Sequence, residues 1–265
     1  MKQIKIVSLI LLLISVIAFG AYKIYEYKTT DNTPPVITAP TDTITASVNI
    51  TEEELLADVS AQDDVSGNVT DALVIEKISS FTDENTRIIT YAAIDEKGNV
   101  GRLQRTLIYT DYEAPTFTLN QPLRVAVGRT TNLFSIVGAN SVLDGDLSNK
   151  VKYTMDSTAD VRKAGTYEIE FRVTDSSGNT AYLTTNLEVY DATAERIQVT
   201  LTDYLIYLTV GAEFDPNNYY KEASVEGELT VASDVDTSQP GVYYVKYTVE
   251  GSNSKGISKL IVIVK

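Results

Sequence analysis

The chain has 265 residues, of which 43% are hydrophobic, with a formal net charge of −14 at pH 7 and neither Cys nor His. Its length and hydrophobic content predict two or three folded domains, while the lack of Cys and His excludes disulfides, thiolate or imidazole metal sites and histidine-based catalysis. The acidic body repels the phosphate backbone, so we expect no nucleic-acid partner.

Residues 1–28 are predicted to form a short cytoplasmic tail and a transmembrane anchor. The stretch over residues 6–22 carries no charge and lies between Lys5 and Lys23. As a helix rising about 1.5 Å per residue it spans roughly 26 Å, close to the thickness of the hydrocarbon core. Because a positively charged N-terminus stays in the cytoplasm, we predict a single-pass protein of the cell membrane with the remainder of the chain extracytoplasmic.

A cleaved signal peptide is the alternative for the same segment. Ala18-Phe19-Gly20 offers small residues where a signal peptidase cleaves. We favour the anchor because the apolar stretch is long for a signal peptide and no clear Ala-x-Ala site follows it. Either interpretation places the remainder of the chain outside the cytoplasm.

An internal repeat follows, and its first copy predicts a domain over residues 31–111. This copy opens with Asp31-Asn32-Thr33-Pro34-Pro35, continues through an acidic turn at residues 64–69 and closes with Asp95-Glu96-Lys97-Gly98-Asn99. The same order of features recurs 80 positions later. A single helical turn is expected over residues 52–56.

The second copy, over residues 112–191, shows the strand pattern most clearly. From Tyr167 to Val173, large apolar residues alternate with polar ones, which places one face of a strand on a core and the other in water. A second alternating strand runs from Ala181 to Val189. Because Ser176-Ser177-Gly178-Asn179 tolerates positive φ, we expect the two strands to form an antiparallel hairpin.

The third copy, over residues 194–265, is divergent. It keeps Glu226-Gly227-Glu228-Leu229 and Gly241-Val242-Tyr243 but lacks the proline opening. Alternation from Tyr243 to Val249 predicts one strand, and Leu260-Ile261-Val262-Ile263-Val264 predicts the last.

Short strands between turn signals, without alternating helices, predict antiparallel β-sandwiches rather than α/β units. Pro34-Pro35 and Ala114-Pro115 lie where one module meets the next. Because proline restricts the backbone on both sides of its peptide bond, we expect stiff junctions and a fairly straight string of modules.

The combined order of motifs resembles the bacterial immunoglobulin-like repeats of surface proteins, which also occur in pesticidal crystal proteins. It consists of Asp-x-x-Pro-Pro, Asp-Gly-Asp-Leu and Gly-Thr-Tyr-x-Ile-x-Phe-x-Val-x-Asp-x-x-Gly-Asn, and it covers residues 31–191 and, less fully, 194–265. The resemblance implies an extracellular spacer, adhesive or carbohydrate-contacting module. The expected fold is therefore all-β, with three tandem immunoglobulin-like antiparallel β-sandwiches after one N-terminal transmembrane helix.

Calcium is the one ligand ion that the acidic turns favour. Asp111 and Glu113 begin the second module, where turns of neighbouring modules are expected to approach, and hard cations prefer several carboxylate oxygens. The candidate ligands are Asp95, Asp111, Glu113, Asp144, Asp146 and Asp175. Turn capping explains the same residues without a metal, and the spacing of an EF-hand loop is absent, so we expect no resident cofactor.

Neither catalysis nor a small-molecule substrate is expected. No nucleophile with a suitable base is present, and the Asp144 and Asp146 pair has the spacing of a β-turn. Tyr219-Tyr220 and Tyr243-Tyr244 offer a stacking platform for a sugar or a protein, although tyrosine at alternating positions is more often part of a sheet and its core.

We therefore expect a non-enzymatic, membrane-anchored bacterial surface protein whose modules act as spacer and adhesion or binding units, with a protein or glycan ligand. The alternatives are a membrane-tethered subunit of an envelope assembly and a secreted accessory binding module. Co-purification with a membrane complex would favour the first alternative, and removal of the N-terminal segment would favour the second.

Overall fold

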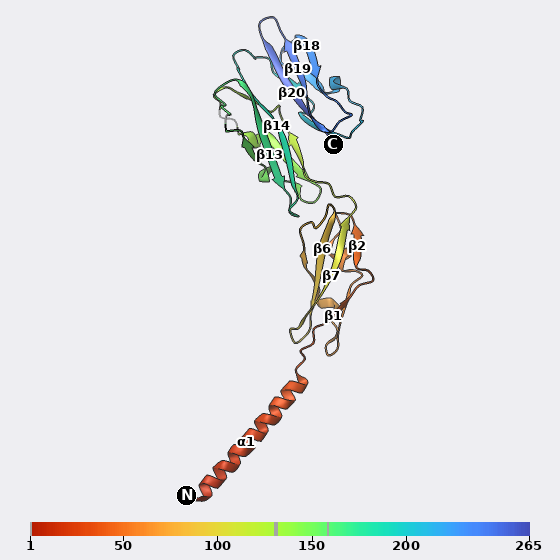
Figure 1. The fold of residues 1–265 in the computed structure, drawn as a ribbon, viewed down its shortest axis with the longest axis vertical. Coiled ribbons are helices and arrows are strands. Elements are labelled where there is room, and N and C mark those ends of the chain that lie inside the picture. Colours follow the sequence, from red (N-terminus) through yellow and green to blue (C-terminus); the bar gives the residue numbers. More distant parts are fainter. Residues whose placement is uncertain (1, 130–131, 158) are drawn as a thin grey trace. The chain divides into compact units, whose positions relative to one another are not determined.

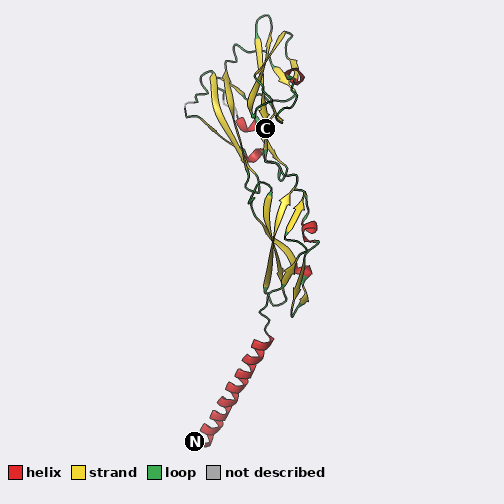
Figure 2. Cartoon of the chain, turned by 45° about the vertical axis from the view of Figure 1, so that its right-hand side comes forward, coloured by secondary structure: helices red, strands yellow, loops and turns green. Residues whose placement is uncertain are grey.

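The computed structural model describes residues 2–129, 132–157 and 159–265. One long helix, α1 (Lys2–Thr29), precedes a chain that consists mainly of β-strands and their turns in these ranges (Figures 1 and 2). The chain divides into two compact units, residues 1–110 and 111–265. The expected all-β fold with one N-terminal apolar helix is confirmed, whereas the domain bounds drawn at residues 111 and 191 stay predictions.

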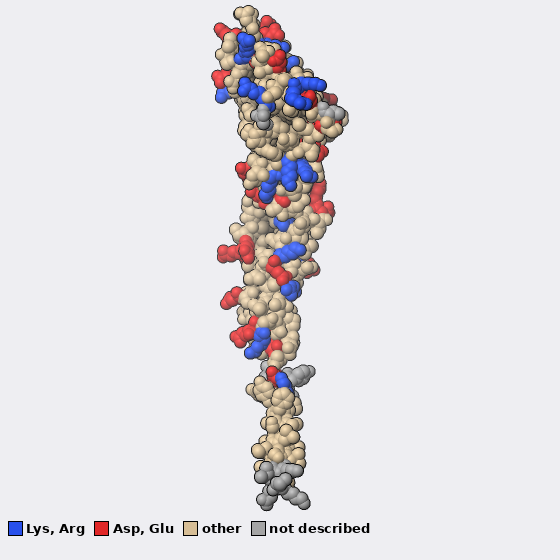
Figure 3. Space-filling view, turned by 90° about the vertical axis from the view of Figure 1, so that its left-hand side faces the viewer, with Lys and Arg blue, Asp and Glu red and all other residues tan. Residues whose placement is uncertain are grey.

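Between residues 6 and 22, helix α1 carries no charged side chain on any face. From Ile6 to Phe19 its large apolar side chains are 52–65% exposed. Figure 3 shows that most of the described helix surface lacks Lys, Arg, Asp and Glu. The exposed Lys23–Glu26 ion pair, 2.6 Å from Nζ to Oε2, lies near its C-terminal end. A helix of this composition does not have the polar face that a helix on the surface of a soluble domain presents.

The first sandwich spans residues 36–109 and consists of a three-stranded and a four-stranded sheet. The smaller sheet has the order β1 (Val36–Thr38), β3 (Ser60–Asp63), β4 (Gly67–Asn68), and the larger has the order β2 (Thr43–Ala46), β7 (Val100–Tyr109), β6 (Thr86–Ile94), β5 (Leu73–Ile78). The pairing of β2 with β7 is parallel, and the other pairings are antiparallel.

A short helix, α2 (Glu52–Leu56), closes the core of this sandwich, which confirms the predicted helical turn. It begins with a capping box, in which the Thr51 side chain accepts from the Glu54 backbone N–H and the Glu54 carboxylate accepts from the Thr51 backbone N–H. The buried Tyr91 hydroxyl donates to the Leu55 carbonyl at 2.9 Å, so the helix is held to β6 by a core residue.

The second sandwich spans residues 116–190 and repeats this plan. One sheet has the order β11 (Gly145–Asp146), β10 (Val137–Ser141), β8 (Thr116–Leu119), and the other has the order β12 (Lys152–Met155), β13 (Gly165–Thr174), β14 (Thr180–Tyr190), β9 (Arg124–Ala126). The predicted hairpin is confirmed, because β13 and β14 pair antiparallel from Gly165 with Val189 to Thr174 with Thr180. Gly178 in its turn has a φ of +89°.

The third sandwich spans residues 199–264 and has a smaller second layer. A two-stranded sheet of β15 (Val199–Leu201) and β17 (Tyr220–Ala223) accompanies a four-stranded sheet in the order β16 (Leu205–Leu208), β20 (Lys255–Val264), β19 (Gly241–Glu250), β18 (Glu228–Ser233). Its core contains fully buried Val245, Tyr247 and Leu260. The Tyr247 hydroxyl donates to the Pro216 carbonyl at 2.6 Å, which satisfies its polar end.

The second and third sandwiches pack against each other within the unit of residues 111–265. Ile261 on β20, which is 3% exposed, belongs to the core cluster of the second sandwich, and Leu205, Val242 and Tyr244 pack against the same cluster. The other face of β20 fills the third core through Leu260, Val262 and Val264. The straight succession of modules expected from the sequence is therefore wrong for this pair, because one sheet of the third sandwich is apolar on both faces and covers its neighbour.

Candidate metal centre and the contact between two sandwiches

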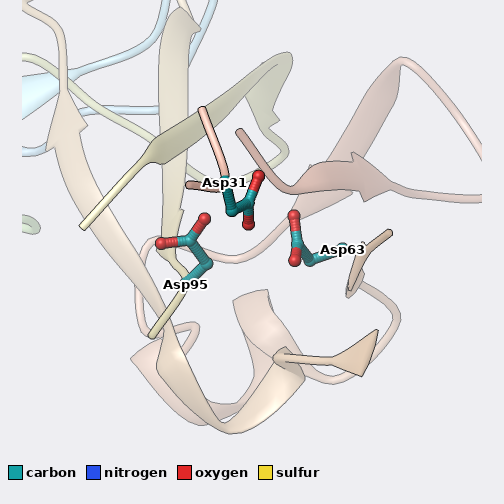
Figure 4. Close-up of side chains that lie close together, drawn as sticks. All are labelled: Asp31, Asp63 and Asp95. Atoms are coloured by element: carbon teal, nitrogen blue, oxygen red, sulfur yellow. The ribbon is translucent and has the colours of Figure 1, made fainter. Parts of the chain in front are cut away.

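Three aspartates of the first sandwich and the segment before it converge on one point. Asp31 lies two residues after α1, Asp63 ends β3, and Asp95 directly follows β6. Each contributes a carboxylate oxygen to a group whose members all lie within 4.8 Å of one another. Figure 4 shows the three carboxylates turned toward a common space. In the part of the chain that the structure describes, no second group of three acidic side chains approaches this closely.

One oxygen of each carboxylate organises its own turn. Asp31 Oδ1 accepts from the Thr33 backbone N–H at 2.9 Å, and Asp63 Oδ1 accepts from the Ser66 backbone N–H at 2.6 Å. Asp95 Oδ1 accepts from the backbone N–H groups of Lys97 and Asn99, both at 2.8 Å. Turn capping therefore explains why aspartate occupies these positions, but in Asp31 and Asp63 it uses only one of the two carboxylate oxygens.

The second oxygens of Asp31 and Asp63 have no partner. Both Oδ2 atoms are buried and accept no hydrogen bond from the residues that the structure describes, and the two residues are 8% and 4% exposed. Asp95 Oδ2 accepts from Asn99 Nδ2 at 2.7 Å. A buried carboxylate oxygen that gives up water without a replacement costs free energy, so these two atoms require an explanation.

The pKa of Asp95 is lowered. Burial acts to raise it, but the side-chain and backbone hydrogen bonds from Asn99, with those from Lys97 and Gly98, outweigh burial. At neutral pH this group therefore presents a carboxylate anion to the two aspartates beside it.

The donor set suits a hard divalent cation. All three side chains offer oxygen, the ligand atom that Ca²⁺ and Mg²⁺ prefer, and together they bring up to three negative charges to one point. Neither nitrogen nor sulfur is among the grouped ligand atoms, so the set does not resemble a zinc site. These residues are therefore able to hold a calcium ion if water completes its coordination.

The corresponding place in the second sandwich is filled by a tyrosine. Asp175 follows β13 as Asp95 follows β6, but Ser141 takes the position of Asp63 at the end of the paired strand. The Tyr112 hydroxyl donates to Asp175 Oδ2 at 2.7 Å and accepts from Asn179 Nδ2 at 2.8 Å. Burial, followed by the bond to Asp175, raises the pKa of Tyr112 to about 12.

Of the six predicted calcium ligands, only Asp95 belongs to a group of three acidic side chains among the described residues. Asp95 joins the cluster described above, and Asp175 bonds Tyr112. Asp144 accepts from the Ser176 backbone N–H at 2.6 Å, and Asp146 accepts from the backbone N–H of Ser148 at 2.9 Å. Asp111 and Glu113 are exposed at the start of the second unit. Calcium binding by Asp111, Glu113, Asp144, Asp146 and Asp175 stays a prediction.

Sequence reasoning missed Asp31 and Asp63. The sequence places Asp31 in the repeated opening and gives no separate signal for Asp63. The available signal was a difference between copies, because the strand pairing aligns acidic Asp63 with neutral Ser141. An additional acidic residue at an aligned, buried position indicates a candidate binding site that the second copy does not share.

A buried ion network joins the second and third sandwiches. Arg124, with a side chain only 5% exposed, contacts Glu188 at 2.9 Å and Glu195 at 2.8 Å through Nη2. Its Nη1 donates to the Ile257 carbonyl at 2.5 Å, and Lys259 forms an ion pair with Glu188. Although burial acts to raise the pKa of Glu188, hydrogen bonds from Arg124 and Lys259 lower it.

Tyrosines contribute polar contacts to the same interface. The Phe117 backbone N–H donates to the Tyr207 hydroxyl at 2.8 Å, and Asn186 Nδ2 donates to the Tyr244 hydroxyl at 3.0 Å. A groove of about 370 Å³ lies beside Tyr244 and is also lined by Asp234 and Lys246. Tyr219 is half-buried and stacks on Phe214, with ring centroids 5.7 Å apart. The Tyr219 and Tyr244 rings are thus engaged in internal packing.

Comparison with known proteins identifies a family. Residues 116–189 and 200–261, just over half of the chain, match the family described as "Bacterial surface protein, Ig-like domain". A curated relative, an uncharacterized 81.3 kDa protein of Acholeplasma phage L2, is 23% identical over 169 residues, which cover 62% of this chain and 23% of the relative. The chain thus corresponds to less than a quarter of that relative's length.

Solved structures that share features with the chain are distant. Drosophila N-cadherin EC1-4 aligns over 78% of this chain and 63% of its own, with 14% identity and a TM-score of 0.23. A carbohydrate-binding module from Clostridium perfringens in complex with GlcNAc aligns over 87% and 42%, with 11% identity and a TM-score of 0.24. A lipoprotein from Bacteroides thetaiotaomicron aligns over 86% and 98%, with 10% identity and a TM-score of 0.21. No ligand or activity is inferred from likeness at this level.

Proposed function

The chain belongs to the bacterial surface protein Ig-like domain family, and we propose that α1 anchors it in the cell membrane while its Ig-like domains act outside the cytoplasm as spacer and binding units. The N-terminus would remain in the cytoplasm, because Lys2 and Lys5 precede the apolar segment. The immunoglobulin-like sandwich of this family is not a catalytic fold, and a non-enzymatic role is part of the proposal.

The observation that carries the proposal is the exposed apolar surface of α1. Its apolar part, Ile6–Glu26, has 21 residues, and none of the tested window is buried in the protein. At about 1.5 Å per residue it is roughly 32 Å long, which matches a hydrocarbon core of about 30 Å. Transfer of each large apolar side chain from water is worth about 1.5–3 kcal/mol, so a lipid environment stabilises this helix far more than water does.

The β domains support the role of a spacer with a binding surface. Their cores are closed by fully buried residues such as Tyr91, Phe171 and Tyr247, and the second and third sandwiches are held together by face packing and the Arg124 ion network. The groove beside Tyr244 is lined by Asp234 and Lys246, and these charged side chains suit a polar ligand such as a glycan or a protein loop.

Membrane extraction of the full chain tests the anchor. We expect the protein to remain in membranes after an alkaline wash and to have the intact mass of 29.1 kDa. The double variant Leu12→Lys/Leu13→Lys should be released, because each lysine at the centre of a span costs about 2.5–3.5 kcal/mol. The control Val225→Lys changes an exposed residue of a β domain and should remain bound. A soluble product that lacks about the first twenty residues would show a secreted protein instead.

A binding screen with the intact protein in detergent tests the second half of the proposal. Arrays of bacterial and host glycans and of matrix proteins should yield a saturable ligand. Substitution of Lys246 by Glu in the groove should weaken that binding, whereas substitution of Lys97, in a turn of the first sandwich, should not. Ligand binding that is unaffected by Lys246→Glu would place the binding surface elsewhere.

A further inference from the structure

We propose that Asp31, Asp63 and Asp95 together bind one calcium ion, at a site that joins the segment after α1 to the first sandwich. The carboxylates of Asp31, Asp63 and Asp95 face a common space (Figure 4), and Oδ2 of Asp31 and Oδ2 of Asp63 are buried and accept no hydrogen bond from any described residue. A cation in this space satisfies both oxygens at once.

The three turns hold the aspartate side chains in place without a bound ion. Backbone N–H groups fix Oδ1 of Asp31, Asp63 and Asp95, so little side-chain freedom remains to be lost on binding. Three carboxylates supply between three and six oxygens, and Ca²⁺ takes about six to eight, with water completing the shell. The larger and geometrically tolerant Ca²⁺ fits such a set better than Mg²⁺, which demands a near-ideal octahedron.

The second sandwich shows how the same fold is built without the three grouped aspartates. There the Tyr112 hydroxyl satisfies Asp175, and Ser141 replaces the acid at the end of the strand. Ser141 Oγ still accepts from the backbone N–H of Leu143 at 3.1 Å, as Asp63 Oδ1 does from Val65 at 3.1 Å. Asp63→Ser therefore retains the turn-capping oxygen and removes only the orphan oxygen.

Calcium binding ties Asp31 to two strand ends that lie 32 and 64 positions later in the chain. The hydrogen bond from Asn99 Nδ2 to the Asp31 carbonyl, at 3.3 Å, and that from Thr33 Oγ1 to Asp64 Oδ1, at 2.5 Å, already hold this segment on the sandwich. The ion adds ligand bonds at the same place, so it stiffens the first residues after the helix.

The test is calorimetric titration of calcium chloride into the full chain in detergent after removal of divalent ions by a chelator. We expect one ion per chain with a Kd of about 10⁻⁴–10⁻³ M, as is typical of extracellular modules, and weaker binding of magnesium. Asp63→Ser should weaken calcium binding at least tenfold. Asp236→Asn, which changes an exposed turn carboxylate of the third sandwich, should leave it unchanged.

Thermal unfolding distinguishes a metal ligand from a residue that only supports the fold. Calcium should raise the Tm of the wild-type first sandwich by several degrees and should not raise that of Asp63→Ser. Without calcium, Asp63→Ser should unfold at the wild-type temperature or above, because it removes a repelling carboxylate. The proposal is overturned if wild type binds no calcium at millimolar concentration, or if Asp63→Ser binds it as tightly.

Discussion

Buried polar side chains in this protein differ in the hydrogen-bond or ion-pair partners that they have. Asp175 accepts from a tyrosine hydroxyl and Arg124 contacts two carboxylates, whereas Oδ2 of Asp31 and Oδ2 of Asp63 accept no hydrogen bond from any described residue. The cost of leaving such groups unpaired makes their partners the sensitive points of the structure.

Alkaline titration tests the environment of Tyr112. Its pKa is raised to about 12, above the usual value of about 10, so the folded state holds the proton more tightly than the unfolded state. The resulting stability is complete below about pH 10 and is lost as the pH rises toward 12. In the Tyr112→Phe variant, tyrosinate absorbance should lose one group that titrates near pH 12. A variant with an unchanged titration curve would contradict this environment.

Arg124→Ala should strongly destabilise the unit of residues 111–265. The substitution leaves Glu188 and Glu195 without their shared partner at a buried position, and breaking such a pair costs about 3–5 kcal/mol. Denaturant unfolding measures the effect. The control Arg102→Ala breaks an exposed pair with Glu76 and should unfold almost as the wild type does, because solvent screens that pair. Equal effects of the two substitutions would refute the structural role of the buried network.

At the scale of elements, alternation in the sequence predicted strands well and contacts between sandwiches poorly. The apolar positions of β13 from Ile169 to Val173 are fully buried, as a period of two requires. The continuous apolar residues from Leu260 to Val264 predict a last strand and, taken alone, no contact with another sandwich. Such continuity is typical of a strand that is buried on both faces, and the structure places Leu260 in the third core and Ile261 in the second.

The candidate site was less predictable than the strands. Aspartate in a turn has the same sequence signature whether it only caps the turn or also faces other acids, so Asp95 and Asp175 were indistinguishable before their neighbours were known. What separates them is a contact between residues far apart in sequence, with Asp31 and Asp63 on one side and Tyr112 on the other. A single sequence does not encode that proximity in any local pattern.

Ile261→Lys should separate the second and third sandwiches without unfolding either core. The residue lies on the face of β20 that covers the second sandwich, and a lysine there buries an unpaired charge. Scanning calorimetry of the full chain should show the transition of residues 111–265 split into two. The control Val225→Lys, at a position that is 52% exposed, should leave a single transition for this unit. An unsplit transition in Ile261→Lys would show that the packing is not what couples the two sandwiches.

At the scale of the whole molecule, the helix α1 and the β domains differ in the environment that suits their surfaces. The described surface of α1 is apolar, whereas acidic side chains predominate in the β domains, as the net charge of −14 requires. Lipid suits the surface of α1, and water suits the surface of the β domains. The central claim is that a single membrane span separates the N-terminus from the Ig-like domains.

Labelling with a membrane-impermeant maleimide tests this claim most directly, because the chain contains no natural Cys. Two single-cysteine variants of the full chain suffice: Gln3→Cys before the apolar segment and Ser252→Cys in the exposed turn between β19 and β20. In intact cells, Ser252→Cys should be labelled, and Gln3→Cys should be labelled only after permeabilisation. Labelling of Gln3→Cys in intact cells together with protection of Ser252→Cys would contradict the proposed topology.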